Sequence, residues 1–356
     1  MELLAYSAGV DISADDFDAC IEGVYDTRAT KVIATRKFKN TAVGFKQFDK
    51  WLFRKAKQKT LLQVGMEATG RYHEGLAYYL FAAGYRISVI LPNKIKHFAY
   101  SVNQYSKNDA LDASLIAAYV SKHVPGAWQP ISESMRDLRE LSRERQALIK
   151  QRTQTKNRLK ALKAGYAPLK KTVARLTEQV DFLNRQLKQV DAEMAQITER
   201  DETLSDNFNL LVSIPHIGAV SAYTIMAETD CFNLFVNRNQ LIKYAGLDVI
   251  EKQSGSSVRG RTKISKRGNA HLRSAPYAGL NAIMRTQSVF VDTYTAALER
   301  GMHPKQARTA VVRQLLRVAF GVVKSGRPYC EANHRNRSVK EVGEHSGSPT
   351  VTDSVA

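Results

Sequence analysis

The sequence contains little cysteine. Its 356 residues include three cysteines, Cys20, Cys231 and Cys330, which lie far apart and follow no metal-ligand spacing. This scarcity excludes a disulfide framework and a cysteine-based zinc site, and it is typical of proteins in a reducing compartment. We therefore expect a cytoplasmic protein.

Long apolar runs are also missing. The most apolar stretch, GLAYYLFAAGYRISVILP, is interrupted by Gly84 and Arg86 and falls short of a membrane-spanning helix. The N-terminal MELLAYSAGVD has neither the basic region nor the cleavage site of a signal peptide. We expect no membrane segment and no secretory signal, while a hydrophobic content of 44% argues against global disorder.

Acidic residues are outnumbered by basic ones. The chain has 53 Lys and Arg against 34 Asp and Glu, which gives a formal net charge of +19 and a pI near 9.8. Such an excess favours a polyanionic partner, nucleic acid before an anionic membrane surface. Because membrane features are missing, we predict that the partner is nucleic acid.

Residues 1–125 have the pattern of a mixed α/β domain. Apolar or alternating stretches predict strands over LLAYSAGVDIS, FDACIEGVYD, KVIATRKFK, LLQVGME and YRISVILP. Helical periodicity is found in TAVGFKQFDKWLFRKAK, GRYHEGLAYYLFAAG, NKIKHFAYSV and DALDASLIAAYVSKH. The expected order is three strands, followed by helices and strands in turn.

Residues 126–202 are charged and helical. Apolar residues from Leu169 to Ile197 recur at alternating spacings of four and three, which predicts a coiled coil. Gly165 and Pro168 separate this helix from a preceding one, so we expect two helices that fold back on each other. The apolar seam serves either this intramolecular hairpin or the association of subunits, and the sequence leaves both open.

Residues 203–326 predict a mostly α-helical C-terminal domain. The turn Pro215-His216-Ile217-Gly218 lies between two apolar helical segments, as in helix-hairpin-helix elements that bind phosphate through backbone N–H groups. An ordinary corner between two helices would have the same pattern. The last stretch, residues 327–356, is polar without an apolar period, and we expect it to be disordered.

Four acidic residues follow or open predicted elements of the first domain. Asp11 ends the first strand, Glu67 ends the fourth, and Asp109 and Asp112 share one face of a helix. Each alone has an ordinary explanation as a cap or turn residue. Because parallel strands end at one sheet edge, the four together predict a carboxylate cluster that needs divalent cations. Two such ions can clamp a phosphodiester, as the layout of an RNase H-like fold of the RuvC type would allow.

Seven motifs in this order carry a resemblance to a known family. They are GVDIS, MEATGRY, KNDALDA, SIPHIG, YAGL, QSGSSVRG and ISKRGNAHLR. With them the chain resembles the DEDD-type transposases of the insertion sequence 110 family, which are similar to the Piv-type DNA invertases. The resemblance implies a prokaryotic recombinase with a RuvC-like catalytic domain, a coiled coil and a C-terminal transposase domain. It also implies that Asp11, Glu67, Asp109 and Asp112 bind Mg²⁺.

The serine-rich loop QSGSSVRG acquires a role through this resemblance. On chemistry alone Ser254, Ser256 and Ser257 are equal candidates for a nucleophile. The family resemblance implies that Ser254 is the nucleophile, that a covalent phosphoserine intermediate forms on it, and that a structured bridge RNA of the element selects donor and target double-stranded DNA. A homo-oligomer, dimer or tetramer, is also expected, in which the coiled coil brings the C-terminal domain of one subunit to the catalytic domain of another.

Basic residues surround this loop and recur in the preceding helices. Six of them are predicted to contact phosphates near the cleaved bond: Arg259, Arg261, Lys263, Lys266, Arg267 and Arg273. A solvated basic face is the alternative, which the Gly/Ser setting beside a candidate nucleophile makes the less favoured one. KQRTQTKNRLKALK and NKIKHFAYSVNQYSK are candidate RNA surfaces. Two other functions fit the residues: a RuvC-like nuclease or junction resolvase that activates water, and a non-enzymatic nucleic-acid scaffold.

Overall fold

The computed structural model describes most of the chain. It covers residues 2–332 apart from 28, 69, 105–108, 251–252, 255–257, 260–262, 284 and 286, and it leaves out the side chains of 109–110, 253–254, 258–259, 281 and 282. The chain divides into two compact units, Met1–Pro130 and Ile131–Ala356, and each is described by itself. Most of the polar tail that was expected to be disordered lies outside the described residues.

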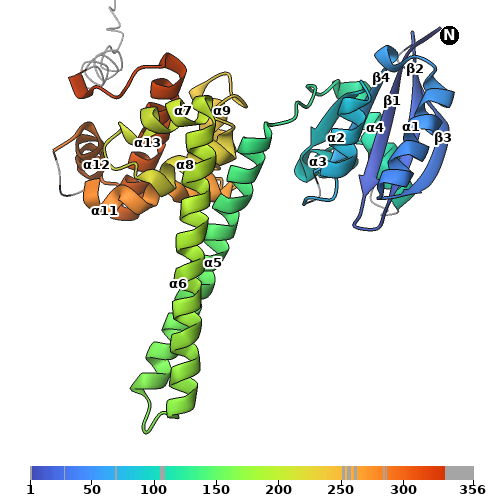
Figure 1. The fold of residues 1–356 in the computed structure, drawn as a ribbon. Coiled ribbons are helices and arrows are strands. Elements are labelled where there is room, and N and C mark those ends of the chain that lie inside the picture. The colour runs from blue at the N-terminus through green and yellow to red at the C-terminus, as the bar shows by residue number, and fades with distance from the viewer. Residues whose placement is uncertain are drawn as a thin grey trace, which may run out of the picture. The chain divides into compact units, whose positions relative to one another are not determined.

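The first unit is built on a five-stranded mixed sheet (Figure 1). Its strands are β1 (Leu3–Ile12), β2 (Asp16–Tyr25), β3 (Thr30–Lys39), β4 (Leu62–Glu67) and β5 (Arg86–Ile90), in the spatial order β3-β2-β1-β4-β5. Strand β2 pairs antiparallel with β1 and β3, whereas β4 is parallel to β1 and β5. The mixed sheet agrees with the fold class predicted for this part of the chain.

Helices cover both faces of this sheet. They are α1 (Ala42–Ala56), α2 (Glu74–Ala82), α3 (Pro92–Ser101) and α4 (Asp109–His123), with a short 3₁₀ turn η1 (Lys59–Leu61). Alternate strand residues such as Val10, Phe17 and Val64 form one buried cluster with Phe48 of α1 and Leu76 of α2. The opposite face packs against α4, and α3 packs against α4 in a cluster that includes Ile90 of β5.

Helix α4 packs closely on the sheet because β1 and β4 have glycines at the contact. A Cβ atom on Gly9 of β1 would lie 2.1 Å from the carbonyl oxygen of Ala113 in α4. A Cβ atom on Gly65 of β4 would lie 2.3 Å from a methyl group of Val120. The backbone of α4 therefore lies directly on β1, at a distance that any larger residue would prevent.

The second unit begins with two long helices, α5 (Glu133–Ala164) and α6 (Lys170–Arg200). They run antiparallel (Figure 1). Arg145 contacts Asp191 and Arg152 contacts Asn184, so residue numbers increase along one helix as they decrease along the other. Ser132 caps the start of α5 through the N–H of Met135, and α5 ends at Gly165. We call this element the helical hairpin.

The apolar seam of α6 is buried within the chain. Leu176, Val180, Leu183, Leu187 and Met194 are all at most 8% exposed, and α6 packs along α5. Two roles were left open for this seam, and in the structure it joins the two helices of an intramolecular hairpin. From Leu176 to Met194 the seam is therefore not exposed for the association of subunits.

The rest of the second unit is mostly helical, as predicted. Its helices are α7 (Glu202–Val212), α8 (Ala219–Thr229), α9 (Arg238–Tyr244), α10 (Ala270–Ser274), α11 (Leu280–Ile283), α12 (Val289–Glu299) and α13 (Pro304–Ser325), with a 3₁₀ turn η2 (Ala275–Gly279). Its short strands are β6 (Val249–Ile250), β7 (Gln253–Ser254), β8 (Val258–Arg259) and β9 (Lys263–Ile264). Helices α7 and α8 flank the turn from Pro215 to Gly218. Among the described residues, no helix is both long and apolar enough to cross a membrane.

The contact at Gly9 gives a testable consequence. Gly9→Ala is expected to destabilise the first unit by about 3 kcal/mol, because the added methyl group meets the backbone of α4. Both tryptophans of the chain, Trp51 and Trp128, belong to this unit, so urea unfolding followed by tryptophan fluorescence reports on it alone. Gly126→Ala is the control, since nothing lies within 4 Å of its added Cβ. Equal midpoints for the two variants would contradict the prediction.

Candidate active site

Asp11 and Glu67 end two neighbouring parallel strands. The register pairs Gly9 with Gly65 and Val10 with Met66, so the next residues, Asp11 and Glu67, stand level with each other. Side chains alternate along a strand, and Asp11 and Glu67 therefore share the face of Gly9 and Gly65, on which α4 lies. Both carboxylates are half-buried. The strand ends thus bring these two predicted site residues together.

Helix α4 adds Asp112 on the same side of the sheet. Asp112 is half-buried and directly precedes Ala113, whose carbonyl oxygen lies over Gly9. Asp109 opens α4, and its side chain lies outside the described residues. Carboxylate oxygens are the ligands that Mg²⁺ prefers, so this set of donors suits the ion chemically. Among the described side chains, no group of three His, Cys, Asp or Glu is arranged to hold a metal ion.

Two charged residues next to these acids were missed by the sequence reasoning. Asp18 of β2 pairs with Asp11 across the antiparallel ladder, and Lys37 of β3 pairs with Asp18. The Lys37 ammonium lies 3.4 Å from Asp18 and 3.3 Å from Asp16, and its hydrogen bond to Asp16 raises the pKa of the lysine. The row Glu67, Asp11, Asp18, Lys37 therefore crosses four strands. The alternation of acids along β2 with lysines along β3 was a signal that could have revealed it.

Another acidic residue, Glu22, is buried beneath α4, further along the sheet. Glu22 is 5% exposed and faces Ser7, which is 2% exposed. Among the described residues, neither Oε2 of Glu22 nor Oγ of Ser7 has a hydrogen-bond partner. Burial raises the pKa of Glu22 to about 7, and the charge of Lys122 in α4 opposes this rise. Glu22 is therefore largely neutral in the folded protein below that pH.

This buried acid predicts a pH dependence. Between the ordinary pKa of 4.5 and the folded-state value of about 7, the folded chain holds a proton that the unfolded chain has released. Stability of the first unit should therefore fall as pH rises through this window, by up to about 3 kcal/mol. Tryptophan-monitored urea unfolding at several pH values measures it. In Glu22→Gln this part of the slope should be absent, and an unchanged slope would contradict the assignment.

In the second unit, Ser254 lies on a β-hairpin. Ser254 of β7 pairs with Val258 of β8, and β6 pairs with β9 nearer the base. The backbone thus places Ser254 close to the turn of this element, which we call the serine hairpin (Val249–Ile264). The side chains of Ser254 and Arg259 lie outside the described residues, as do Arg261, Ser256 and Ser257. Lys263 is exposed on β9.

The base of the serine hairpin is held by close backbone contacts. The N–H groups of Ser265, Lys266 and Asn269 donate to the carbonyl oxygens of Asp248 (2.9 Å), Gly246 (3.0 Å) and Tyr244 (2.7 Å). A Cβ on Gly268 would lie 2.2 Å from the oxygen of Tyr244, and Gly246 has a φ of +65°. The stretches YAGL and SKRGNAHLR are therefore packed backbone to backbone, which requires both glycines.

Three of the predicted basic contacts follow this base. Lys266 and Arg267 are exposed and available to a partner. Arg273 is half-buried, and its guanidinium donates to the carbonyl oxygen of Ala245 at 2.9 Å. Arg273 therefore serves the fold of this region. Its contact with nucleic acid stays a prediction, as do those of the other basic residues.

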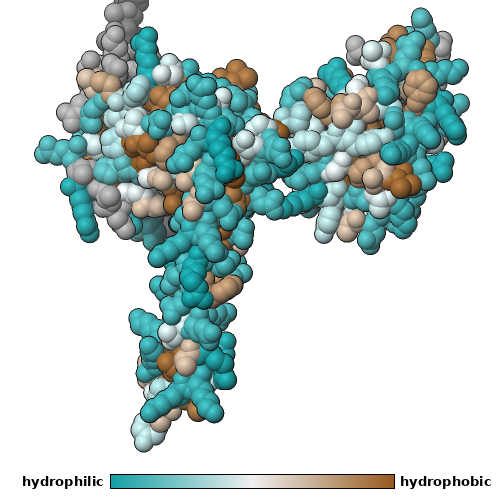
Figure 2. Space-filling model, in the orientation of Figure 1, coloured by the Kyte–Doolittle hydropathy of each residue, from teal (hydrophilic) through white to brown (hydrophobic). Residues whose placement is uncertain are grey.

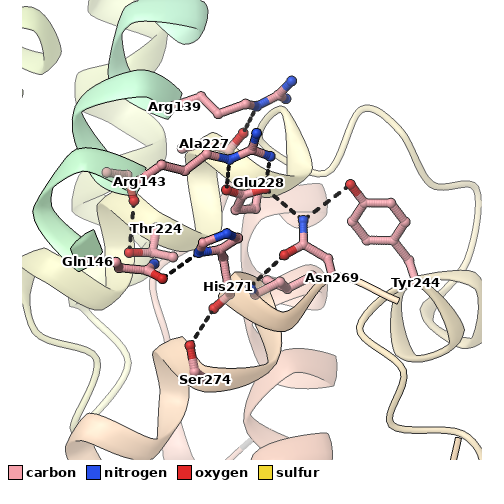
Figure 3. A network of polar contacts seen from close by, with 12 residues as sticks. Arg139, Arg143, Gln146, Thr224, Ala227, Glu228, Tyr244, Asn269, His271 and Ser274 are labelled. Carbon is pink, nitrogen blue, oxygen red and sulfur yellow. Dashed lines mark hydrogen bonds and ion pairs between the residues drawn. The ribbon is translucent and has the colours of Figure 1, made fainter. Parts of the chain in front are cut away.

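A polar network joins this region to the helical hairpin (Figure 3). Glu228 of α8 is 1% exposed and accepts two hydrogen bonds from Arg143 of α5, at 2.8 and 2.9 Å. Asn269 donates to Glu228 at 2.6 Å and also caps α10 by accepting from the N–H of Leu272. Burial acts to raise the pKa of Glu228, but the hydrogen bonds from Arg143 and Asn269 outweigh it and lower the pKa.

The same face of α5 makes the neighbouring contacts of this network. Arg139 donates to the carbonyl oxygen of Ala227 at 2.7 Å, Ser142 donates to Thr224 at 3.1 Å, and Gln146 contacts His271. Positions 139, 142, 143 and 146 form a polar stripe at helical spacing. These residues were not predicted, because they lie outside the apolar repeat of the helix and their partners lie far away in the sequence.

Removal of the buried charge should loosen the base of the serine hairpin. Glu228→Gln leaves Arg143 without its carboxylate and is expected to cost about 3 kcal/mol. Hydrogen exchange of the amides in α8 and α10 measures the effect, because these helices meet at Glu228 and Asn269. Asp191→Asn is a matched control. It breaks the ion pair between Asp191 of α6 and Arg145, which lies on α5 like Arg143. Because Asp191 is more exposed than Glu228, the loss should cost about 1 kcal/mol or less. Equal exchange in both variants would refute this account.

Comparisons with known proteins bear on the whole chain. Residues 8–168, which include the four predicted acids, match the DEDD-type transposase family of IS110. Residues 208–295, which include Ser254, match a family described as transposase IS116/IS110/IS902. The chain belongs to the IS110 family of transposases. It is therefore an enzyme that cuts and rejoins DNA.

Individual relatives extend this finding. The chain is similar to the pilin gene-inverting protein of Moraxella bovis, with 27% identity over 92% of this chain and 98% of that protein. It is 26% identical to the transposase for insertion sequence element IS1111A of Coxiella burnetii, over 78% of this chain and 77% of that one. A solved structure of Thermus thermophilus RuvC with a Holliday junction substrate matches 35% of this chain and 99% of its own, with 12% identity and a TM-score of 0.27.

Proposed function

We propose that this IS110-family transposase recombines DNA through a phosphoserine intermediate on Ser254, with Mg²⁺ bound by Asp11, Glu67, Asp109 and Asp112 of a RuvC-like domain. The level positions of Asp11 and Glu67, under a helix that carries Asp112, support the metal-binding part. The position of Ser254 near the turn of a hairpin with an anchored base supports the nucleophile. The first of these observations carries the proposal.

The proposed chemistry consists of two transesterifications. In the first, Oγ of Ser254 forms a bond to the phosphorus of a DNA strand while the bond from phosphorus to the bridging oxygen breaks. The hydroxyl proton is released to a base or to water, and the departing strand oxygen takes up a proton. In the second, the hydroxyl of an incoming strand attacks the phosphoserine, and the serine leaves as a free hydroxyl.

Each group of residues has a distinct task in this scheme. When bound, Mg²⁺ supplies charge that polarises the phosphate and stabilises the developing negative charge. The four carboxylates hold the ions, and the exposed Lys266 and Arg267, beside the anchored base, bind neighbouring phosphates. Donor and target DNA are selected by a structured guide RNA of the element, and the enzyme acts as a homo-oligomer.

The nucleophile is tested by trapping the covalent adduct. The full chain is incubated with Mg²⁺, the RNA transcribed from the element's flank and labelled double-stranded DNA, and the products are separated on a denaturing gel. We expect a protein–DNA adduct that is lost in Ser254→Ala, because the attacking oxygen is missing. Ser256→Ala and Ser257→Ala are matched controls from the same loop and should retain it.

Further arms of this experiment separate the rival functions. Asp11→Asn should abolish both the adduct and DNA cleavage, because the metal site loses a ligand. Cleavage that persists without an adduct in Ser254→Ala would favour the RuvC-like nuclease or junction resolvase, in which water attacks. An adduct that forms equally well without the RNA would refute the guide RNA and leave the phosphoserine in place.

A further inference from the structure

The outer part of the helical hairpin has only positive charge. Residues 146–177 contain nine lysines and arginines and no aspartate or glutamate. They are Lys150, Arg152, Lys156, Arg158, Lys160, Lys163, Lys170, Lys171 and Arg175. Because α5 and α6 are antiparallel, the two halves of this stretch lie side by side around residues 165–169. We call this part the hairpin tip.

The charges of the hairpin tip are directed into solvent. All but Arg152 are exposed, and in the described part of the chain none of the nine forms an ion pair. Arg152 itself is half-buried and donates to Asn184. At the base of the hairpin, by contrast, Arg143 and Arg145 are paired with Glu228 and Asp191. The space-filling view shows a mostly hydrophilic surface over this element (Figure 2).

An aromatic side chain stands at the end of the tip. Tyr166, in the connection between α5 and α6, is fully exposed, and Leu169 beside it is 64% exposed. Lys163, Lys170 and Lys171 flank this connection. A tyrosine without packing partners does not stabilise the hairpin, but it offers a free ring face surrounded by cations.

Charge and shape together select one partner. A second copy of the chain would need a broad apolar surface, but among the tip's described residues Leu169 is the one large aliphatic side chain that is strongly exposed, and from Leu176 to Met194 the seam of α6 is buried against α5. A polyanion compensates the unpaired charges. Among polyanions, only a nucleic acid with unpaired bases also presents a flat ring to Tyr166, because the bases of a duplex are stacked on one another.

We propose that the hairpin tip binds a single-stranded segment of nucleic acid. Tyr166 stacks on an unpaired base, and the lysines and arginines of both helices contact the flanking phosphates. No step of the phosphoserine chemistry uses the tip, so this binding site goes beyond the proposed function and stands independently of Ser254.

The test measures binding by the full chain at several salt concentrations. Fluorescence anisotropy is recorded with labelled oligouridine RNA, the matching oligothymidine DNA and a DNA duplex of equal length. Replacement of three tip lysines, Lys156→Gln, Lys160→Gln and Lys163→Gln, should lower the slope of log affinity against log salt by about 2 for the single strands. Tyr166→Ala should weaken single-strand binding about tenfold, whereas Tyr166→Phe should retain it.

A charge-matched control separates the tip from the general field of the protein. Arg185→Gln, Lys188→Gln and Arg200→Gln remove three exposed charges from the middle and the base of α6, outside the tip, and should leave the slope nearly unchanged. Equal losses in the two triple variants would overturn the proposal, as would a Tyr166→Ala protein that binds single strands normally. Greater loss of duplex than of single-strand binding in the tip variants would overturn it too.

The relative affinities for RNA and DNA identify the physiological strand, and either order supports the site. Ser254→Ala should bind as tightly as the unaltered chain. Failure of the phosphoserine mechanism is therefore distinguishable from failure of the tip. Sedimentation of the tip variants should show an unchanged oligomeric state, and a shift in mass would assign the surface to contact between copies instead.

Discussion

The arrangement of the first unit depends on the direct contact of α4 with the sheet at Gly9 and Gly65. Strand ends fix Asp11 and Glu67 through backbone hydrogen bonds, but Asp112 comes from a helix, which needs a separate constraint. Gly9 and Gly65 provide this constraint because they have no side chain. Backbone packed against backbone leaves α4 little freedom to slide. Glycine at these positions thus acts on the geometry of Asp11 and Glu67, each two residues away along its strand, and of Asp112 in α4.

The sequence predicted the order of strands and helices in the first unit, and the structure confirms that order. Apolar alternation was sufficient to place Asp11 and Glu67 at the ends of two strands, because that signal is local, while their role as metal ligands stays a prediction. The pairing of Asp18 with Asp11 and Lys37 was missed, since it depends on register between strands. That register includes an irregularity between Ile21 and Glu22, which no local pattern reveals.

In the second unit, the limits of the sequence were different. The heptad spacing predicted two long helices, yet it left open whether the seam joined helices of one chain or of two. Burial of the seam against α5 answers this, because it is a property of the folded chain. The Arg143–Glu228–Asn269 network was out of reach for another reason: its members lie on three elements, and hydrogen bonding across them follows no period.

Helix α5 uses each of its faces in a different way, and this constrains how the hairpin can act. Its seam face is buried against α6, and its polar stripe, including Ser142 and Arg143, is bound to α8 and α10. The contact with α6 extends along the hairpin, and the contact with α8 and α10 is made near its base. Both lie within one chain. What α5 leaves for a partner is mostly charged surface, and burial of unpaired charge is costly. An assembly of several copies must therefore be held by surfaces other than the seam, or by a polyanion that bridges them.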